Sequence, residues 1–246
     1  MVSPSVRRVA IICPADDYVG PALIATMAQR NYDLVIGGKL PSGVETGSVN
    51  VVRIDDADPH DLTTGTRLVE AAKSEFGTFH SAFFSSGRIA LGRFSKTNVD
   101  DLRSAFEGNV VAPYAYVQAV LPTLVEQADG QIVVATSATA DTPTPSASLY
   151  AGTRAAATMM LRSVAKEVMD RNVQINVVGT NFMDFPGFLR GNKAESAEGR
   201  VRVESLVPMK RLGSMQEFAN FCAVFLDGTS RFQSGQFHSY AGGWGI

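Results

Sequence analysis

The sequence predicts an α/β fold built on a doubly wound, seven-stranded parallel sheet with helices on both faces. Short apolar runs typical of buried strands alternate with longer amphipathic stretches from one end of the chain to the other. No linker, internal repeat or low-complexity tract interrupts the 246 residues, a length suited to one α/β domain. We therefore predict a single Rossmann-like domain over residues 1–246.

The apolar runs and the helical spacing define the expected elements. Strands are expected at 9–13, 34–37, 51–54, 81–85, 132–136, 175–179 and 235–239. Helices are expected at 20–30, 60–76, 98–127, 150–171 and 215–227. Ligands of such sheets bind outside the carboxyl ends of the strands. The loops after Cys13, Thr136 and Gly179 follow three of these ends, so we expect them to line one crevice.

Composition excludes several classes of function. The net charge is −2, and no basic stripe suggests a nucleic-acid partner. No apolar run is long enough to span a membrane, and the N-terminal residues lack the features of a signal peptide, so we expect a cytoplasmic protein. Cys13 and Cys222 have neither metal-ligand nor redox spacing, and we expect two buried thiols and no metal site.

Three residues between the fifth expected strand and the helix after it can handle a proton. Ser137 follows the strand 132–136, Tyr150 begins the next helix, and Arg154 follows Tyr150 by four residues. Residues i and i+4 are neighbours on one helix face, so tyrosine and arginine lie close together. A serine at a strand end that faces a tyrosine–cation pair predicts a catalytic site made of Ser137, Tyr150 and Arg154.

The order of elements and these three residues resemble the short-chain dehydrogenase/reductase superfamily. The resemblance covers nearly the whole chain and extends to Asp55, Asn109 and the closing AGGW. Asn109 is expected to be structural. The superfamily's usual triad is Ser, Tyr and Lys, whereas this chain has Arg154 at the lysine position.

The nucleotide-binding residues of that superfamily are largely missing. Its T-G-x-x-x-G-x-G loop aligns with residues 13–20, where only Gly20 is retained. Pro14 offers no N–H, Tyr18 places a ring where bare backbone is needed, and Asp16 and Asp17 add negative charge. Two further cofactor motifs also depart, at 85–87 and at 180–185. Lys39 is the one residue that could still pair with a 2′-phosphate. We therefore expect no cofactor.

The combination of a Ser-Tyr-Arg triad with an aromatic residue in the glycine loop resembles halohydrin dehalogenases. The resemblance implies a halide or nucleophile pocket lined by Tyr18, Thr180, Asn181, Phe182 and Met183. Thr180 replaces the family's usual proline, and Tyr18 stands where phenylalanine is frequent. Aromatic ring edges carry the positive side of the ring quadrupole and suit a large anion.

The resemblance implies an enzyme that converts vicinal halohydrins to epoxides plus halide, without a nicotinamide. In reverse, azide, cyanide or nitrite would open the epoxide. Its partners would be a small halohydrin or epoxide, a halide or another small anion, and other copies of the chain in a homotetramer paired through the helices 98–127 and 150–171. Two alternatives stay open: an NAD(P)-dependent oxidoreductase with a divergent nucleotide loop, and a non-catalytic protein on this fold.

Overall fold

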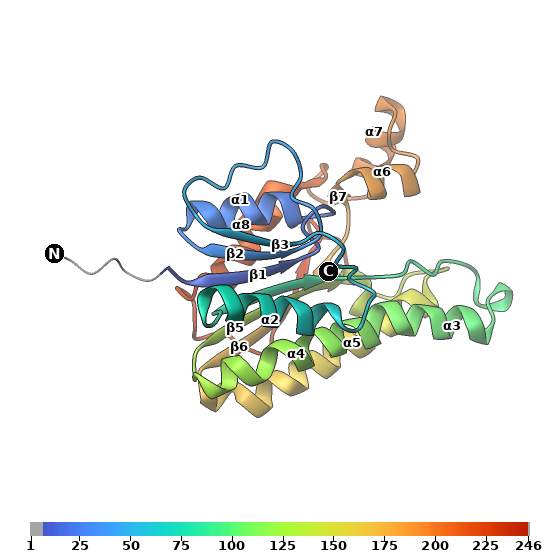
Figure 1. Ribbon diagram of the computed structural model, residues 1–246. Coiled ribbons are helices and arrows are strands. Elements are labelled where there is room, and N and C mark those ends of the chain that lie inside the picture. Colours follow the sequence, from blue (N-terminus) through green and yellow to red (C-terminus); the bar gives the residue numbers. More distant parts are fainter. Residues whose placement is uncertain (1–6, 246) are drawn as a thin grey trace.

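Seven parallel strands form the central sheet, in the order β3-β2-β1-β4-β5-β6-β9 (Figure 1). The computed structural model describes residues 7–245; the first six residues, part of the stretch searched for a signal peptide, lie outside it. The strands are β1 (Val9–Cys13), β2 (Asp33–Gly37), β3 (Val51–Ile54), β4 (Ser81–Ser85), β5 (Gly130–Ser137), β6 (Val173–Thr180) and β9 (Phe237–Tyr240). The strand order reverses between β1 and β4, which is where such sheets bind ligands.

Helices cover both faces of this sheet, as predicted (Figure 1). One face carries α1 (Gly20–Gln29) and α8 (Met215–Leu226), and the other carries α2 (Thr64–Phe76), α4 (Ala112–Glu126) and α5 (Ser148–Val168). Neighbouring strand residues such as Ile11 and Ile12 pack into different apolar cores, one on each face. The strands therefore read as continuous apolar runs because both of their sides are buried.

The helix expected over 98–127 is divided into two helices. It consists of α3 (Val99–Phe106), a π-helical turn (Glu107–Val111) and α4. The buried Asn109 lies in the π turn, where its Nδ2 donates to the carbonyl of Arg88 and to the hydroxyl of Thr153. Its Oδ1 accepts from the backbone N–H of Arg88. Asn109 thus joins three segments near the carboxyl ends of the strands, in agreement with the expected structural role.

Several short elements were not predicted. Beyond β6, the chain forms α6 (Pro186–Gly191), α7 (Ala197–Ser205) and a small two-stranded sheet of β7 (Met183–Asp184) with β8 (Gly213–Ser214). The helices α6 and α7 project beyond the sheet at its carboxyl end (Figure 1). Three 3₁₀ turns lie at Phe94–Lys96, Ala138–Ala140 and Met169–Arg171. Such short pieces show too few turns for a helical period to stand out.

The start of α2 lies four residues later than expected. The carboxylates of Asp58 and Asp61 accept hydrogen bonds from the backbone N–H groups of His60 and Thr63, two residues on. These two side-chain turns use residues that the apolar pattern assigned to the helix. The imidazole of His60 is consequently carried by a fixed turn.

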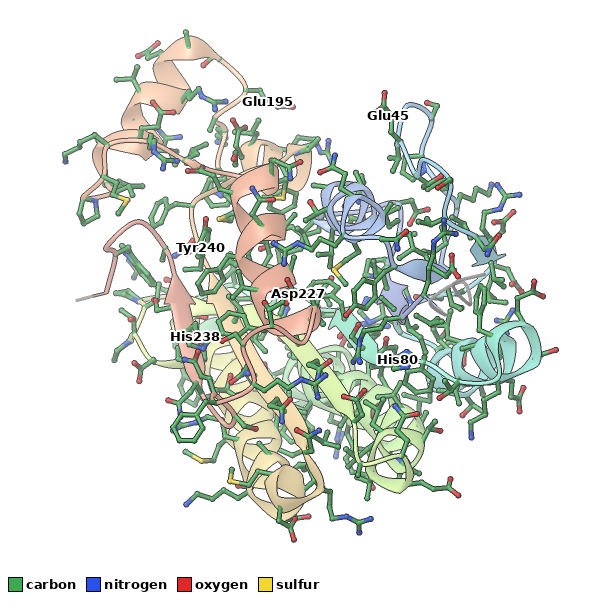
Figure 2. The ribbon with its side chains drawn as sticks, turned by 90° about the vertical axis from the view of Figure 1, so that its left-hand side faces the viewer. Glu45, His80, Glu195, Asp227, His238 and Tyr240 are labelled. Carbon is green, nitrogen blue, oxygen red and sulfur yellow. The ribbon has the colours of Figure 1, made fainter. Side chains whose placement is uncertain are left out.

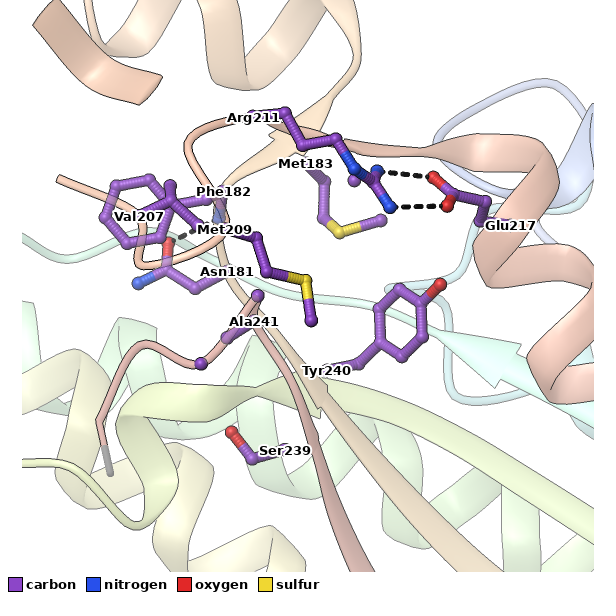
Figure 3. A pocket seen from close by; sticks show the side chains of 13 residues that line it. Asn181, Phe182, Met183, Val207, Met209, Arg211, Glu217, Ser239, Tyr240 and Ala241 are labelled. Carbon is purple, nitrogen blue, oxygen red and sulfur yellow. Dashed lines mark hydrogen bonds and ion pairs between the residues drawn. The ribbon is translucent and has the colours of Figure 1, made fainter. Parts of the chain in front are cut away.

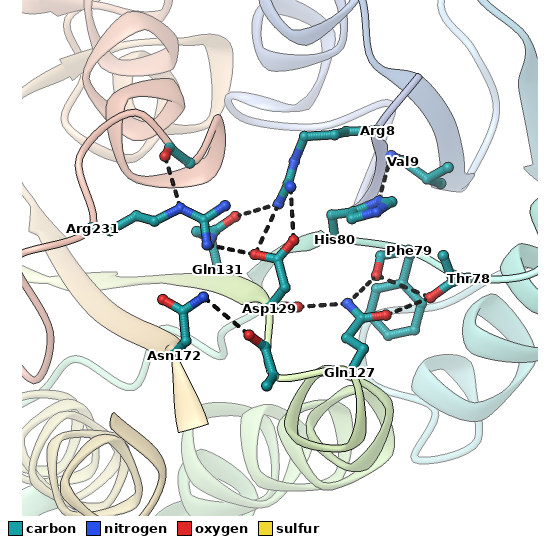
Figure 4. Close-up of polar contacts among 12 residues, drawn as sticks. Arg8, Val9, Thr78, Phe79, His80, Gln127, Asp129, Gln131, Asn172 and Arg231 are labelled. Carbon is teal, nitrogen blue, oxygen red and sulfur yellow. Dashed lines mark hydrogen bonds and ion pairs between the residues drawn. The ribbon is translucent and has the colours of Figure 1, made fainter. Parts of the chain in front are cut away.

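A polar network lies at the N-terminal ends of the strands, at the opposite end of the sheet from the carboxyl ends (Figure 4). Arg8 precedes β1 and Asp129 precedes β5; their side chains form an ion pair, and Arg231 pairs with the same carboxylate. At the edge of the sheet, His238 and Tyr240 are carried by β9 (Figure 2). Through the ion pair of Arg231 with Asp129, the network links the segment between α8 and β9 to the N-terminal end of β5.

Three further expectations concern membrane-spanning helices, metal ligands and the two cysteines. Between residues 7 and 245, no helix is long and apolar enough to cross a bilayer. In the same range, no group of acidic, histidine or cysteine side chains could hold a metal ion. Cys13 and Cys222 are buried free thiols, as expected, and desolvation raises the pKa of Cys13 to about 12. Cys13 therefore stays protonated although it ends β1 at the crevice.

Candidate active site

Ser137 is the last residue of β5 and is oriented by the turn that follows it. Its hydroxyl oxygen accepts hydrogen bonds from the N–H of Thr139 at 3.2 Å and from the Thr139 hydroxyl at 2.9 Å. As a donor, the Ser137 hydroxyl has one contact, from its oxygen to the carbonyl oxygen of Thr180 at 3.5 Å. Such a long contact is weak. The buried Ser137, 4% exposed, can therefore donate its proton to another oxygen atom in the site.

Tyr150 and Arg154 lie on the first turns of α5, as their spacing predicts. The guanidinium carbon of Arg154 lies 5.2 Å from the centroid of the Tyr150 ring, within cation–π distance. Tyr150 is half-buried, whereas Arg154 is only 6% exposed. The structure thus places a buried positive charge beside a half-buried tyrosine.

The position of Arg154 depends on a glycine that sequence reasoning treated only as part of a missing motif. A β-carbon on Gly87 would lie 1.9 Å from Nη2 of Arg154, so the guanidinium occupies the space that a side chain would need. The Nε and Nη1 atoms of Arg154 are buried and have no partner among the described residues. Gly87 lies two residues beyond the end of β4, and its missing side chain lets the cation lie against the loop backbone.

Tyr18 crosses from the loop after β1 to the end of β6. Its hydroxyl lies 2.5 Å from the hydroxyl of Thr180, and Thr180 is the strand partner of Ser137. Its ring packs edge-on against Phe185 at 4.9 Å and at a tilt against Phe218 at 5.6 Å. Desolvation raises the pKa of Tyr18, although the hydrogen bond with Thr180 opposes the shift. Tyr18 is therefore a neutral hydroxyl beside the strand partner of Ser137.

The five residues expected to bind halide do not all face one space. Tyr18 and Thr180 meet beside Ser137, whereas Asn181, Phe182 and Met183 line a separate pocket of about 270 Å³ (Figure 3). The wall of this pocket also includes Met209 and Tyr240 and the Arg211–Glu217 ion pair; the remaining lining residues are Val207, Gly213, Ser239, Ala241, Gly242 and Gly243.

The backbone explains why the set divides. The strand β6 ends at Thr180, so Asn181, Phe182 and Met183 lie beyond the main sheet, and Phe182 has a left-handed conformation with φ of +55°. Its ring packs against Phe188 and against Trp244, whose centroid is 5.8 Å away. The oxygen of the Asn181 side chain accepts from the N–H of Phe182. Trp244 thus packs on a residue that lines the pocket of its own chain.

The family, sequence and structure comparisons with known proteins agree on one superfamily. A protein-family model described as "Enoyl-(Acyl carrier protein) reductase" matches residues 42–245. The chain belongs to the short-chain dehydrogenase/reductase superfamily. The 2,5-dichloro-2,5-cyclohexadiene-1,4-diol dehydrogenase LinX of Sphingobium indicum is 24% identical over 97% of this chain and 96% of its own length. The family match begins after the loop between β1 and α1.

Two solved structures share this fold. "ElxO with NADP Bound" superimposes with a TM-score of 0.86 at 19% identity, covering 97% of this chain and 98% of that chain. "Dehalogenation enzyme" superimposes with a TM-score of 0.82 at 21% identity, with the same coverage. These likenesses confirm the predicted fold class. As a group, the comparisons favour the NAD(P)-dependent alternative over cofactor-independent dehalogenation.

The residues of the dinucleotide loop do not fit the cofactor that the superfamily implies. A β-carbon on Gly20, at the start of α1, would lie 2.2 Å from the carbonyl oxygen of Pro14 and 2.7 Å from that of Ala15. Gly20 therefore packs closely on the loop backbone, and its N–H donates to the carbonyl oxygen of Asp17 at 3.0 Å, so the loop itself uses a donor that a diphosphate would need. The carboxylate of Asp16 lies against Gly38, at the end of β2. Lys39 is exposed there and has no described partner.

Proposed function

We propose that this short-chain dehydrogenase/reductase relative converts vicinal halohydrins to epoxides and halide without a nicotinamide, and catalyses epoxide opening by small anions in reverse. The observation that carries the proposal is the position of Tyr18. Its ring and hydroxyl bridge the remnant of the glycine loop to Thr180, beside the catalytic serine. The loop that would bind a diphosphate instead uses the Gly20 N–H for its own hydrogen bond and carries Asp16 and Asp17, so the proposed reaction involves no hydride transfer.

The substrate hydroxyl binds between Ser137 and Tyr150. Ser137 donates its free proton to the substrate oxygen, because both hydrogen bonds from Thr139 already use its acceptor capacity. Tyr150 takes the proton of the substrate hydroxyl as general base. The Arg154 guanidinium supplies positive charge beside the tyrosine, which must carry negative charge before it takes that proton.

Ring closure then needs only the substrate's own atoms. The alkoxide oxygen attacks the neighbouring carbon, a carbon–oxygen bond forms, and the carbon–halogen bond breaks with its electron pair on the halide. The hydroxyl of Thr180, the strand partner of Ser137, and the ring of Tyr18, whose hydroxyl meets that of Thr180, can solvate the leaving anion. In the reverse direction the protonated Tyr150 returns its proton to the epoxide oxygen.

A second candidate is an NAD(P)-dependent oxidoreductase, which the comparisons favour. LinX is named a dehydrogenase, and ElxO was solved with NADP. In that function the same Ser137 and Tyr150 would hold and protonate a carbonyl oxygen. The two candidates differ in one requirement, the nicotinamide, and the loop geometry favours the first.

Halide release from a simple bromo- or chloro-alcohol, with no nicotinamide added, tests the proposal. We expect release by the wild type and by Tyr114→Phe, a control that alters an exposed tyrosine on α4. Tyr150→Phe should reduce release at least about 100-fold, the lower range of general-base effects. Absence of release by the wild type, together with saturable NADPH or NADH binding, would instead support the oxidoreductase.

A further inference from the structure

The loop 141–147 connects the catalytic serine to the helix that carries the catalytic tyrosine. It follows the 3₁₀ turn after Ser137 and ends where α5 begins, and Tyr150 lies in the first turn of that helix. The residue at the helix start is Ala147, which forms no side-chain cap. The first N–H groups of a helix lack partners within the helix, and uncapped ends fray. The position of Tyr150 therefore depends on how the loop before it is held.

One contact holds the end of this loop that adjoins α5. The N–H of Gly92, in the segment after β4, donates to the carbonyl oxygen of Ser146 at 2.7 Å. Any residue except proline can make this bond at position 92. Within the loop, Pro143 and Pro145 have no N–H to donate. The bond at Ser146 leaves the beginning of the loop, around Thr142, to a second contact.

The second contact comes from residues 241–245, which follow β9 and which we call the strap. A β-carbon on Gly245 would lie 2.3 Å from Oγ1 of Thr142, and 3.2 Å from both its Cβ and its Cγ2. The strap backbone thus packs directly on Thr142, and only a residue without a side chain leaves room for it. Gly245 also has φ of +90°, a conformation that glycine adopts readily.

The strap is anchored at its other end beside the pocket of Figure 3. The carbonyl oxygen of Gly242 accepts from the N–H of Met209 at 3.1 Å, and a β-carbon on Gly242 would lie 2.6 Å from Cγ1 of Val207. Between the two ends, the ring of Trp244 packs on that of Phe182. Met209 and Phe182 line the pocket, so the strap runs from the pocket wall to the loop of the catalytic residues (Figure 3).

We propose that Gly245 is a positioning residue: through Thr142 the strap holds the loop 141–147, and with it the uncapped start of α5, so that Tyr150 stays in place for proton transfer. The inference rests on the proposed function for the role of Tyr150 as general base. An alanine at position 245 needs space that Thr142 occupies. Rotating the hydroxyl away does not clear it, because Cβ of Thr142 is also within 3.2 Å. Whichever segment yields, the first turn of α5 loses this support.

The kinetic test compares Gly245→Ala with Gly43→Ala. Gly43 has φ of +84° and nothing within 4 Å of its added β-carbon, so its variant has a similar backbone cost without the contact. Gly245→Ala should lower kcat for halide release at least about tenfold, with a smaller change in KM, since misplacing a catalytic group by about 1 Å can cost about 100-fold. Gly43→Ala should keep the wild-type rate.

A second substitution separates positioning from general damage to the fold. In Gly245→Ala/Thr142→Ala the obstructing Oγ1 and Cγ2 atoms are gone, so the strap can pack on the loop again and most of the lost rate should return. A Gly245→Ala variant with the wild-type kcat, or a double variant as slow as Gly245→Ala, would overturn the role of the strap while leaving the dehalogenase proposal intact.

A second measurement does not depend on turnover. Amide hydrogen exchange in a peptide that covers residues 148–154 reports opening of the first turns of α5. Exchange there should be about tenfold faster in Gly245→Ala than in wild type, and unchanged in Gly43→Ala. Unchanged exchange in Gly245→Ala overturns the inference whatever the activity. An inactive wild type overturns the proposed function and with it the positioning role, even where the exchange shows that the strap stabilises α5.

Discussion

The hydroxyl groups of Tyr18 and Thr180 lie 2.5 Å apart and connect the loop after β1 to the end of β6. In related folds with a nucleotide site, the loop after the first strand is rich in glycine, so that its backbone can approach the pyrophosphate. Here this loop carries Tyr18, whose hydroxyl meets that of a residue 162 positions along the chain.

The Tyr18–Thr180 contact should contribute to stability as a pair. We expect a coupling energy of about 1 kcal/mol from a double-mutant cycle of Tyr18→Phe and Thr180→Val, the usual net value of a hydrogen bond. Urea unfolding at neutral pH measures it. Independent, additive effects of the two substitutions would show that the hydroxyls do not form a stabilising hydrogen bond.

Gly87→Ala should displace the Arg154 guanidinium from its position against the loop. We expect halide release to fall about 100-fold, because misplacement of a catalytic group by about 1 Å has effects of this size. Gly92→Ala is the matched control: a β-carbon there would meet only the Thr97 methyl group, at 3.4 Å. Equal rates for the two variants would mean that the position of Arg154 does not limit the reaction.

Asp129→Asn should weaken the network at the N-terminal ends of the strands (Figure 4). Desolvation of the Asp129 carboxylate is outweighed by the hydrogen bonds from Arg8 and Arg231, so the pKa of Asp129 is lowered. We expect a loss of about 2 kcal/mol in the free energy of unfolding at pH 7.

The pH dependence of this loss has a definite sign. A lowered folded-state pKa gives stability that is present above the unfolded value of about 3.9 and disappears as the pH falls through the folded value. The difference between wild type and Asp129→Asn should therefore shrink below pH 4. Asp100→Asn, which alters an exposed pair with Arg103, should change stability by less than about 0.5 kcal/mol at any pH.

The proposed homotetramer would cover apolar side chains that are exposed in the single chain. Phe106, Tyr114 and Met159 lie on the outer helices α3, α4 and α5, with 43%, 48% and 59% exposure. Light scattering should give the mass of four chains for the wild type and a smaller species for Met159→Glu. Val201→Glu, on the projecting helix α7, should keep the wild-type mass. A monomeric wild type would contradict the proposal.

The elements that depend on a local sequence pattern could be predicted from the sequence. The apolar runs predicted the seven strands of the main sheet, most clearly the five inner ones that are buried on both sides; the edge strands β3 and β9 are only partly buried. The four-residue spacing predicted the contact between Tyr150 and Arg154. The ends of elements were less predictable. The turn at Asp58 shortened α2, and the π turn at Asn109 divided a helix that looked continuous.

Contacts set by side-chain direction could not be predicted. The importance of Gly87 follows from where the long arginine side chain turns, which no spacing encodes. The division of the expected halide residues follows from the end of β6 at Thr180, beyond which Phe182 has a left-handed backbone, a conformation uncommon for a phenylalanine.

The close contact of Gly20 with the carbonyl oxygens of Pro14 and Ala15 has a consequence for attempts to re-engineer this loop. The N–H groups at a helix start can bind an anion; here the Gly20 N–H donates to the carbonyl oxygen of Asp17. The loop is held by Tyr18 at one end and by the close contact at Gly20 at the other. Replacing Tyr18 by glycine alone would remove the first contact and leave the second in place. A loop designed to bind a diphosphate would therefore need changes at both ends together.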